Sequence, residues 1–246
     1  MVAAENGALA GGKVGGVGDV IRDLPLALTA LGWEATVLTP AYGMFNELPD
    51  ATLLRSIQVD FAGSMQTASV WKISGADRHV THLAIEHPLL SPDGPGKIYC
   101  NDAADRPFAT DAGKFAFFCA AVAAFVQQND NTPDVIHLHD WHTALFLLLR
   151  AHGPAFEQLQ NIRTVYTIHN LAFQGIRPLA YDDSSLAAWF PELADPLPVA
   201  TDPRYTDCVN PMAAAIRLAD KLNTVSPTYA REILRPSDPA HGFSGG

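Results

Sequence analysis

Hydrophobic residues recur along this chain in two alternating patterns, one with the spacing of a strand and one with that of a helix. Short β-branched runs predict buried strands at residues 34–40, 134–139, 163–169 and 222–225. Apolar residues at helical spacing predict helices at residues 17–31, 111–128, 143–151, 211–221 and 227–234. Strands that alternate with helices predict an α/β fold with a mostly parallel sheet and helices on both faces.

Two segments depart from this alternation. Residues 53–61, 67–73 and 80–86 alternate or run apolar with turn residues between them, including the turn at 75–77, and predict a β-meander inserted into the α/β pattern. Residues 170–207 have no clear period and contain five prolines. A structureless loop of that length is uncommon in a compact domain, so we expect short helices within it, for instance at 184–189.

Composition limits the classes of function. The chain has 246 residues, 48% hydrophobic and 17% charged, with a formal net charge of −10. This composition predicts a large core and argues against nucleic acid or anionic membrane partners, which need clustered Lys and Arg. Three cysteines without a C-x-x-C pair favour a reducing compartment. With no run of 18 apolar residues and no leader-like start, we expect a cytoplasmic protein without a membrane span.

A glycine-rich stretch, residues 11–20 (GGKVGGVGDV), follows a short apolar run at residues 2–4 and opens the first predicted helix, an order that predicts a strand, a glycine loop and a helix. Such a loop lets backbone N–H groups approach a ligand, and the helix start behind it favours anionic groups. A phosphate loop of the G-x-x-x-x-G-K type would need Ser or Thr at Val14, and a dinucleotide fingerprint would need glycine at Ile21. A plain tight turn between strand and helix is the simplest alternative.

Residues 137–142 (HLHDWH) form a second motif, at the end of a predicted strand. Alternation along the strand places His137 and His139 on one face, and we expect His139, the last strand residue, to face a cleft. A binuclear metal site is an alternative that His169 would join, but the aspartate stands at 140 where that pattern needs it at 141. Buried core histidines are the third possibility. The glycine loop, residues 139–140 and residues 169–170 all fall at carboxyl ends of predicted parallel strands, where ligands bind in such sheets.

Four motifs in order resemble those of bacterial glycogen synthases and plant starch synthases. Residues 13–20 (KVGGVGDV) resemble K-[VT]-G-G-[LIV]-[GA]-D-V, and residues 134–142 (DVIHLHDWH) resemble D-[VI]-[VI]-H-x-H-D-W-H. Residues 167–175 (TIHNLAFQG) and 224–232 (TVSPTYARE) are similar to two further segments of the same family. The motifs extend over nearly the whole chain.

The resemblance implies one half of a glycosyltransferase with two Rossmann-like domains. Such enzymes move glucose from ADP-glucose to the non-reducing end of an α-1,4-glucan, with retention and without a metal or other cofactor. Residues 1–246 are then expected to be the N-terminal, acceptor-side domain, and the second, nucleotide-binding domain is expected beyond residue 246. The isolated chain is expected to be inactive.

The same resemblance assigns roles to individual residues. The expected donor-binding residues are Lys13, Gly15, Gly16 and Asp19. His139 matches a catalytic residue that contacts the transferred glucose. The expected acceptor contacts are Glu5, Asn170 and Gln174.

The chain also departs from the family pattern. The spacing between Glu5 and Lys13 is longer than usual, and Ala213 and Ala215 replace a lysine and a glycine of the motif at 210–216. Two other functions stay open: a non-enzymatic glucan-binding module derived from this domain, and a metallohydrolase built on His137, His139 and His142.

Overall fold

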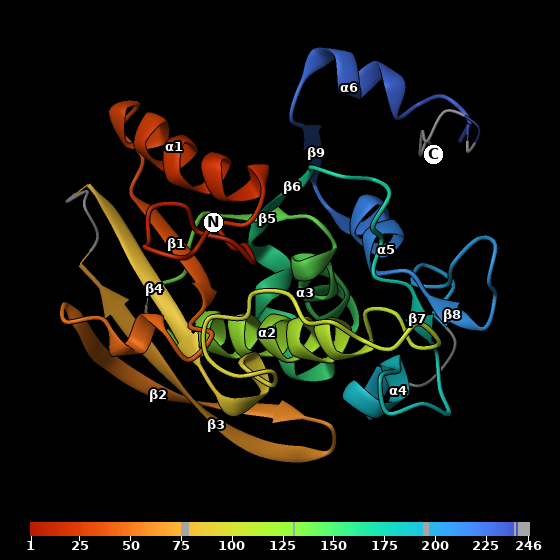
Figure 1. Ribbon diagram of the computed structural model, residues 1–246, viewed down its shortest axis with the longest axis horizontal. Helices are drawn as coiled ribbons and strands as arrows, with labels where there is room; N and C mark the ends of the chain where they lie inside the picture. The colour runs from red at the N-terminus through yellow and green to blue at the C-terminus, as the bar shows by residue number, and fades with distance from the viewer. Residues whose placement is uncertain (75–78, 130, 194–196, 239, 241–246) are drawn as a thin grey trace.

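The centre of the structure is one sheet assembled from two groups of strands (Figure 1). The computed structural model describes residues 1–246 except 75–78, 130, 194–196, 239 and 241–246. The first group has the order β1-β4-β3-β2 and the second β5-β6-β9. These strands are β1 (Ala35–Pro40), β2 (Ala51–Phe61), β3 (Ser64–Ile73), β4 (Val80–Glu86), β5 (Val135–His139), β6 (Arg163–Ile168) and β9 (Lys221–Thr224).

Val2 joins the two groups of strands. Its backbone forms parallel bridges to Leu38 of β1 and to Leu138 of β5, so a very short segment stands at the centre of the sheet. All neighbours from β4 through Val2 to β9 are parallel, whereas β2 and β3 are antiparallel at one edge. The predicted mostly parallel sheet is confirmed. The meander is part of this sheet, because every residue of β1 pairs with a residue of β4.

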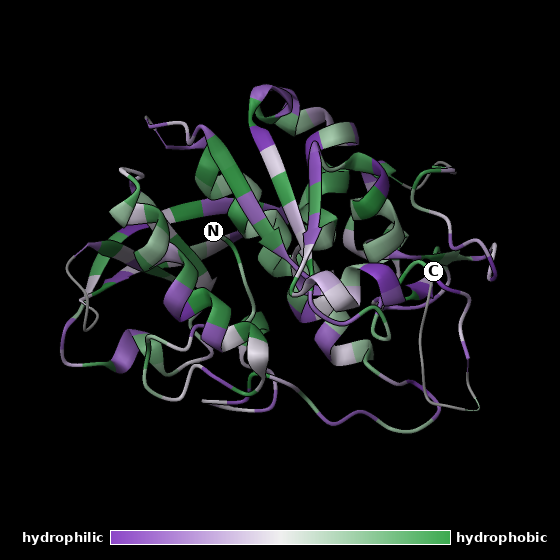
Figure 2. Cartoon of the chain, turned by 90° about the horizontal axis from the view of Figure 1, so that it is seen from above, coloured by the Kyte–Doolittle hydropathy of each residue, from purple (hydrophilic) through white to green (hydrophobic). Residues whose placement is uncertain are grey.

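Helices cover both faces of the sheet, as the alternation predicted. They are α1 (Gly16–Ala30), α2 (Ala109–Gln127), α3 (Trp141–His152), α4 (Leu186–Trp189), α5 (Pro211–Leu218) and α6 (Pro227–Glu232). Successive strand residues point to opposite faces. Val37 therefore packs against Ile21 of α1, whereas Leu38 joins the larger core formed with α2 and α3. In Figure 2 the strands carry long stretches in green, the colour of hydrophobic residues.

Helix α2 runs through the main core. Its length and mean hydropathy would suffice for a membrane span, but 89% of its most apolar 18-residue window is buried inside the protein. Phe115, Phe117 and Phe118 are all almost completely buried. The composition of α2 is therefore that of a core helix, which explains why its residues are apolar all round.

Most predicted boundaries lie within two residues of those observed, and the exceptions are the start of β3, at Ser64 instead of residue 67, and the end of α5. Helix α5 ends at Leu218 instead of continuing to residue 221. The reason is Asp220, whose carboxylate accepts hydrogen bonds from the N–H and hydroxyl of Thr164 at 2.8 and 2.9 Å and ties the chain to the sheet. The predicted short helix in the segment 170–207 is confirmed as α4. The same segment contains β7 (Arg177–Pro178), which pairs with β8 (Cys208–Val209), the two residues that follow the segment. The predicted turn at 75–77 lies outside the described residues.

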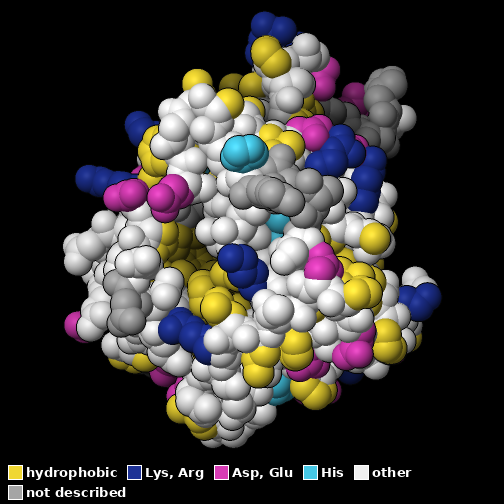
Figure 3. Space-filling model, turned by 90° about the vertical axis from the view of Figure 1, so that its left-hand side faces the viewer, with side chains coloured by type: hydrophobic (Ala, Val, Ile, Leu, Met, Phe, Trp, Pro, Cys, Tyr) yellow, Lys and Arg dark blue, Asp and Glu magenta, His cyan; other side chains and the backbone are white. Residues whose placement is uncertain are grey.

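The surface carries both signs of charge on the face that Figure 3 shows. Lys and Arg side chains lie interspersed with Asp and Glu side chains over the described part of that face. Mixed charge of this kind gives no field of a single sign along that face.

Candidate functional site

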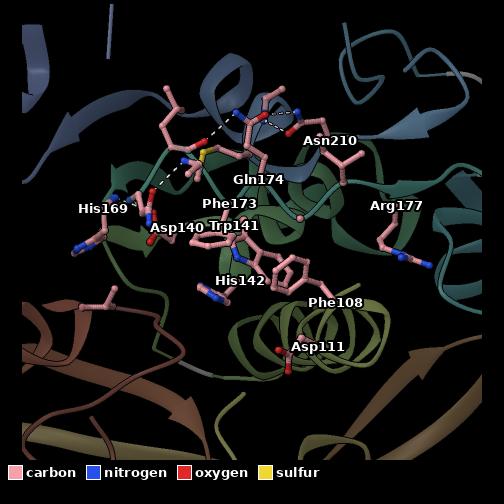
Figure 4. A pocket seen from close by; sticks show the side chains of 18 of the residues that line it. Phe108, Asp111, Asp140, Trp141, His142, His169, Phe173, Gln174, Arg177 and Asn210 are labelled. Atoms are coloured by element: carbon pink, nitrogen blue, oxygen red, sulfur yellow. Dashed lines mark hydrogen bonds between the residues drawn. The ribbon is translucent and has the colours of Figure 1, made fainter. Parts of the chain in front are cut away.

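A large cavity opens where the carboxyl ends of the central strands meet. Its volume is about 1060 Å³. The glycine loop that follows Val2, the residues after β5 and the loop after β6 all line it, as the sequence predicted for a parallel sheet. Figure 4 shows side chains from these segments pointing into a shared space, with α2 along one side.

The glycine loop is wound tightly and held by the carboxylate of Glu5. This buried carboxylate accepts hydrogen bonds from the N–H groups of Val14 at 2.8 Å and Gly15 at 2.7 Å, and from the hydroxyl of Tyr99 at 2.9 Å. Two of the N–H groups that we expected to face a ligand are therefore bound within the protein. The start of α1 at Gly16 has no side-chain cap, and Gly16 and Val17 line the cavity.

The long spacing between Glu5 and Lys13 is taken up by a closed turn. The N–H of Asn6 donates to the carbonyl of Gly12 at 2.7 Å, so the ends of residues 6–12 lie side by side. A Cβ on Gly12 would stand 2.3 Å from the carbonyl oxygen of Asn6, so this position requires glycine. Residues 6–12 thus form a closed turn, and the Glu5 carboxylate still contacts the glycine loop.

Lys13 and Asp19 form an exposed ion pair beside the cavity. Lys13 Nζ lies 2.6 Å from Asp19 Oδ2, and Arg22 contacts the other carboxylate oxygen at 3.1 Å. The hydrogen bond from Lys13 holds the pKa of Asp19 below its usual range. Of the four expected donor-binding residues, Gly15 and Gly16 line the cavity, and Lys13 and Asp19 stand outside its lining.

The histidines at the end of β5 are stacked and buried. His137 and His139 lie on one face with ring centroids 4.2 Å apart, as predicted from the alternation. The expectation that His139 faces the cleft is wrong, because its side chain is fully buried beneath His169, with His139 Nδ1 2.9 Å from His169 Nε2. His169 and His142 line the cavity in its place. Burial lowers the pKa of His169 to about 4 and that of His142 to about 3, so both rings are neutral at pH 7.

Asp140 links the ends of β5 and β6. Its carboxylate accepts the N–H groups of His169 at 2.7 Å and Asn170 at 3.3 Å, and burial raises its pKa to about 6. Asp140 also has a φ of +56°, a left-handed conformation that is costly for a residue with a side chain. These hydrogen bonds hold the loop after β6 against the start of α3 and maintain the strained backbone at Asp140.

The metal-site alternative finds no matching arrangement in the part of the chain that the structure describes. There, no group of three or more His, Cys, Asp or Glu side chains is placed to hold one ion. His137 Nε2 is 2.6 Å from the hydroxyl of Thr167, and His139 is paired with His169. His137 and His139 are thus held by different partners.

The expected acceptor residues lie together. Glu5, Asn170 and Gln174 all line the cavity. The side-chain oxygen of Gln174 accepts a hydrogen bond from Asn210 Nδ2 at 2.6 Å, which connects the loop after β6 to the start of α5. Ala213, where the family pattern has lysine, also lines the cavity, whereas Ala215 is fully buried.

Comparison with known proteins places the chain in a family. The sequence profile of the starch synthase catalytic domain matches residues 1–245. The chain belongs to the starch synthase catalytic domain family. Among its relatives, the glycogen synthase of Gloeobacter violaceus is 34% identical over 238 residues, which cover 96% of this chain and 43% of that protein. The glycogen synthase of Variovorax paradoxus is 36% identical over 240 residues, which cover 91% of this chain and 44% of that protein.

A solved structure shows the same architecture. The catalytic domain of starch synthase IV from Arabidopsis thaliana, bound to ADP and acarbose, matches with a TM-score of 0.75 and 27% identity over 96% of this chain and 46% of that one. The starch synthase-family chain described here therefore has the fold of one part of that catalytic domain. It spans less than half the length of these relatives.

Several residues of this starch synthase-family cavity escaped the sequence analysis. Those that no motif singled out include Tyr99, Phe108, Arg177 and Asp202. Their partners are distant in sequence: Tyr99 reaches Glu5, 94 residues away, and Arg177 donates to the carbonyl of Pro107, 70 residues away. Hydrophobic period and motif spacing report local structure only, so neither could have found such contacts.

Gly175 is expected to be essential for the shape of the loop after β6. Its φ is +72°, and a Cβ there would stand 2.4 Å from Cε3 of Trp141. We expect Gly175→Ala to lower the free energy of unfolding by about 3 kcal/mol, through backbone strain plus overpacking. Gly63→Ala is the control, because Gly63 has a φ of +69° but open space around it. Urea denaturation should show a loss of about 1 kcal/mol for the control, and equal losses would disprove the clash with Trp141.

Stability is expected to fall as the pH drops below 6.5. Burial lowers the pKa of His137 and His169 to about 4 and that of His142 to about 3, so protons bind the unfolded chain first. Asp140 acts in the opposite sense between pH 6 and 3.8, but it is one group against four buried histidines, because burial also lowers the pKa of His139. Between pH 6.5 and 4 we expect a loss of at least about 2 kcal/mol of unfolding free energy. His142→Gln should make the pH profile shallower, and an unchanged profile would contradict the assignment.

Proposed function

We propose that residues 1–246 are the N-terminal, acceptor-side domain of a glycogen or starch synthase. The complete enzyme would transfer glucose from ADP-glucose to the non-reducing end of an α-1,4-glucan, with retention at the anomeric carbon. A second Rossmann-like domain would supply most contacts to the nucleotide. We propose a cytoplasmic location, and no cofactor is needed for this chemistry.

One observation carries the proposal. The uncapped start of α1, the neutral rings of His142 and His169, and the acceptor residues Glu5 and Gln174 all line a single cavity. The likeness to an enzyme bound to ADP and acarbose supports a nucleotide at one part of this cavity and a glucan at another.

The charges in the cavity suit the expected reaction. Departure of ADP places negative charge on the diphosphate and positive charge on the sugar ring. The positive end of the α1 dipole and the nearby ammonium of Lys13 stabilise the negative charge on the diphosphate. The rings of His142 and His169 are neutral, because burial holds their pKa values far below 7, so they do not repel the positive charge on the sugar ring.

Labelled ADP-glucose and glycogen test the proposal with the complete protein, in which both domains are present. Incorporation of label into glucan is the expected result. Binding of glucan without any transfer would instead favour a non-enzymatic glucan-binding module derived from this domain.

Lys13 is expected to contribute strongly to turnover in the complete protein. In the proposed closed site its ammonium leaves Asp19 for the donor phosphates, so Lys13→Ala should reduce kcat by about a hundredfold. Arg22→Ala is the matched control, because Arg22 also contacts Asp19 but lies within α1 and not in the glycine loop. Steady-state rates should change by less than about twofold for the control. Equal losses in both variants would remove Lys13 from the donor site.

A further inference from the structure

Two half-exposed phenylalanine rings meet at the cavity wall. Phe108 is 47% exposed and Phe173 is 48% exposed. Their ring centroids are 5.7 Å apart and their planes are inclined by 70°. One ring comes from the residue before α2 and the other from the loop after β6. Figure 4 shows both in the middle of the pocket, between Gln174 and Asn210 on one side and Asp111 on the other.

The backbone at Phe108 has a strained conformation. Phe108 has φ +62° and ψ 13°, a left-handed conformation that is uncommon for an aromatic residue. Its carbonyl accepts the N–H of Ala112 at 2.8 Å, and the carbonyl before it, that of Pro107, accepts from the buried side chain of Arg177 at 3.3 Å. Strain held in place by surrounding contacts is typical of ligand-binding positions.

The backbone at Phe173 is also tied to its surroundings. The N–H of Phe173 donates to the carbonyl of Asn170 at 3.4 Å, and Gly175 packs directly on Trp141. The backbone that carries each ring is thus tied to neighbouring segments, and the two rings contact each other edge to face at an aromatic corner. A preformed surface binds with a smaller loss of conformational entropy.

Polar side chains surround this aromatic corner. Asn210 Nδ2 donates to Gln174 at 2.6 Å and to Asp202 Oδ2 at 2.7 Å, and all three residues line the same cavity. Arg177 lines it as well. An apolar platform beside amide and carboxylate groups matches the two sides of a pyranose, whose ring faces carry C–H groups and whose rim carries hydroxyls.

We propose that Phe108 and Phe173 form a stacking subsite for a glucose unit of the acceptor glucan. This inference rests on the proposed function. The uncharged rings offer nothing to a diphosphate, which the start of α1 suits better. One ring would stack on the face of the sugar, and the other would contact its edge, while Gln174, whose side chain Asn210 orients, binds the hydroxyls. A protein segment covering the same rings is the competing occupant, and the test separates the two.

Affinity electrophoresis of the purified chain in gels containing glycogen tests the subsite. We expect Phe108→Ala and Phe173→Ala each to raise the Kd for glycogen about tenfold, which is about 1.4 kcal/mol. Phe108→Tyr and Phe173→Tyr keep a stacking ring and should bind within about twofold of the wild type. Tyr181→Ala is the matched control, because Tyr181 is a fully exposed aromatic residue with φ +65° that lies outside the cavity lining.

The outcomes are distinct. Wild-type retardation that both alanine variants reduce and both tyrosine variants preserve would confirm the subsite. Wild-type retardation that the alanine variants leave unchanged would overturn the subsite alone, and a loss of thermal stability of the complete protein in the same variants would then assign the rings to a protein contact. A wild-type chain that glycogen does not retard would overturn the acceptor-side function together with the subsite.

Discussion

Replacing His139 with alanine is expected to abolish glucose transfer by the complete enzyme without unfolding this domain. His139 is fully buried at the end of β5, and its Nδ1 lies 2.9 Å from Nε2 of His169, which lines the cavity. Burial, with two histidines beside it, keeps the pKa of His139 well below its usual value, so the ring is neutral. Its loss would release the His169 ring from its position at the cavity wall, and in the proposed active site such misplacement costs far more rate than stability.

Two controls separate positioning from other roles of His139. His139→Asn offers an amide near the position of Nδ1 and should recover part of the activity that His139→Ala loses. Circular dichroism should show the same secondary structure for both variants and the wild type. Chelator treatment should leave the wild-type rate unchanged. Inactivation by chelator with recovery on adding zinc would favour a hydrolase built on His137, His139 and His142.

The elements of this fold could be predicted because their signals are local. Helical and strand periods located the strands of the main sheet, and the apolar run before the glycine loop predicted the short central segment at Val2 as well. Pairing is not local, so the parallel register of β4 with β1 could not be derived from the alternation in residues 80–86. The end of α5 was also misplaced, because Asp220 is fixed by Thr164, a residue 56 positions away.

The site could be predicted in its location but not in its contacts. Strand ends in a parallel sheet place the glycine loop, Asp140 and His169 together, and the structure confirms this. The same reasoning assumed that the loop amides were free, whereas the Glu5 carboxylate binds those of Val14 and Gly15. No pattern in the sequence indicates that a carboxylate eight residues before Lys13 folds back onto the loop, because the connecting turn closes through backbone hydrogen bonds.

The chain of residues 1–246 alone is expected to fold and to transfer no measurable glucose from ADP-glucose. It spans less than half the length of its relatives, and the cavity is bounded only by its own segments. On this side the diphosphate would meet the start of α1 and Lys13, but the amides of Val14 and Gly15 are already bound to Glu5. We therefore expect ADP-glucose to bind with a Kd in the millimolar range, about −4 kcal/mol.

Weak binding alone would not prevent slow transfer, so the expected inactivity rests on two further requirements. The transition state needs charge stabilisation from both sides of the cleft, and a closed cleft must exclude the water that would otherwise intercept the activated sugar. Labelled ADP-glucose and glycogen, incubated with the isolated chain and separately with the complete protein, measure this directly. Label should appear in glucan only with the complete protein, while circular dichroism shows that the isolated chain is folded. Incorporation by the isolated chain at a comparable rate would mean that this one wall supplies both the charge stabilisation and the exclusion of water.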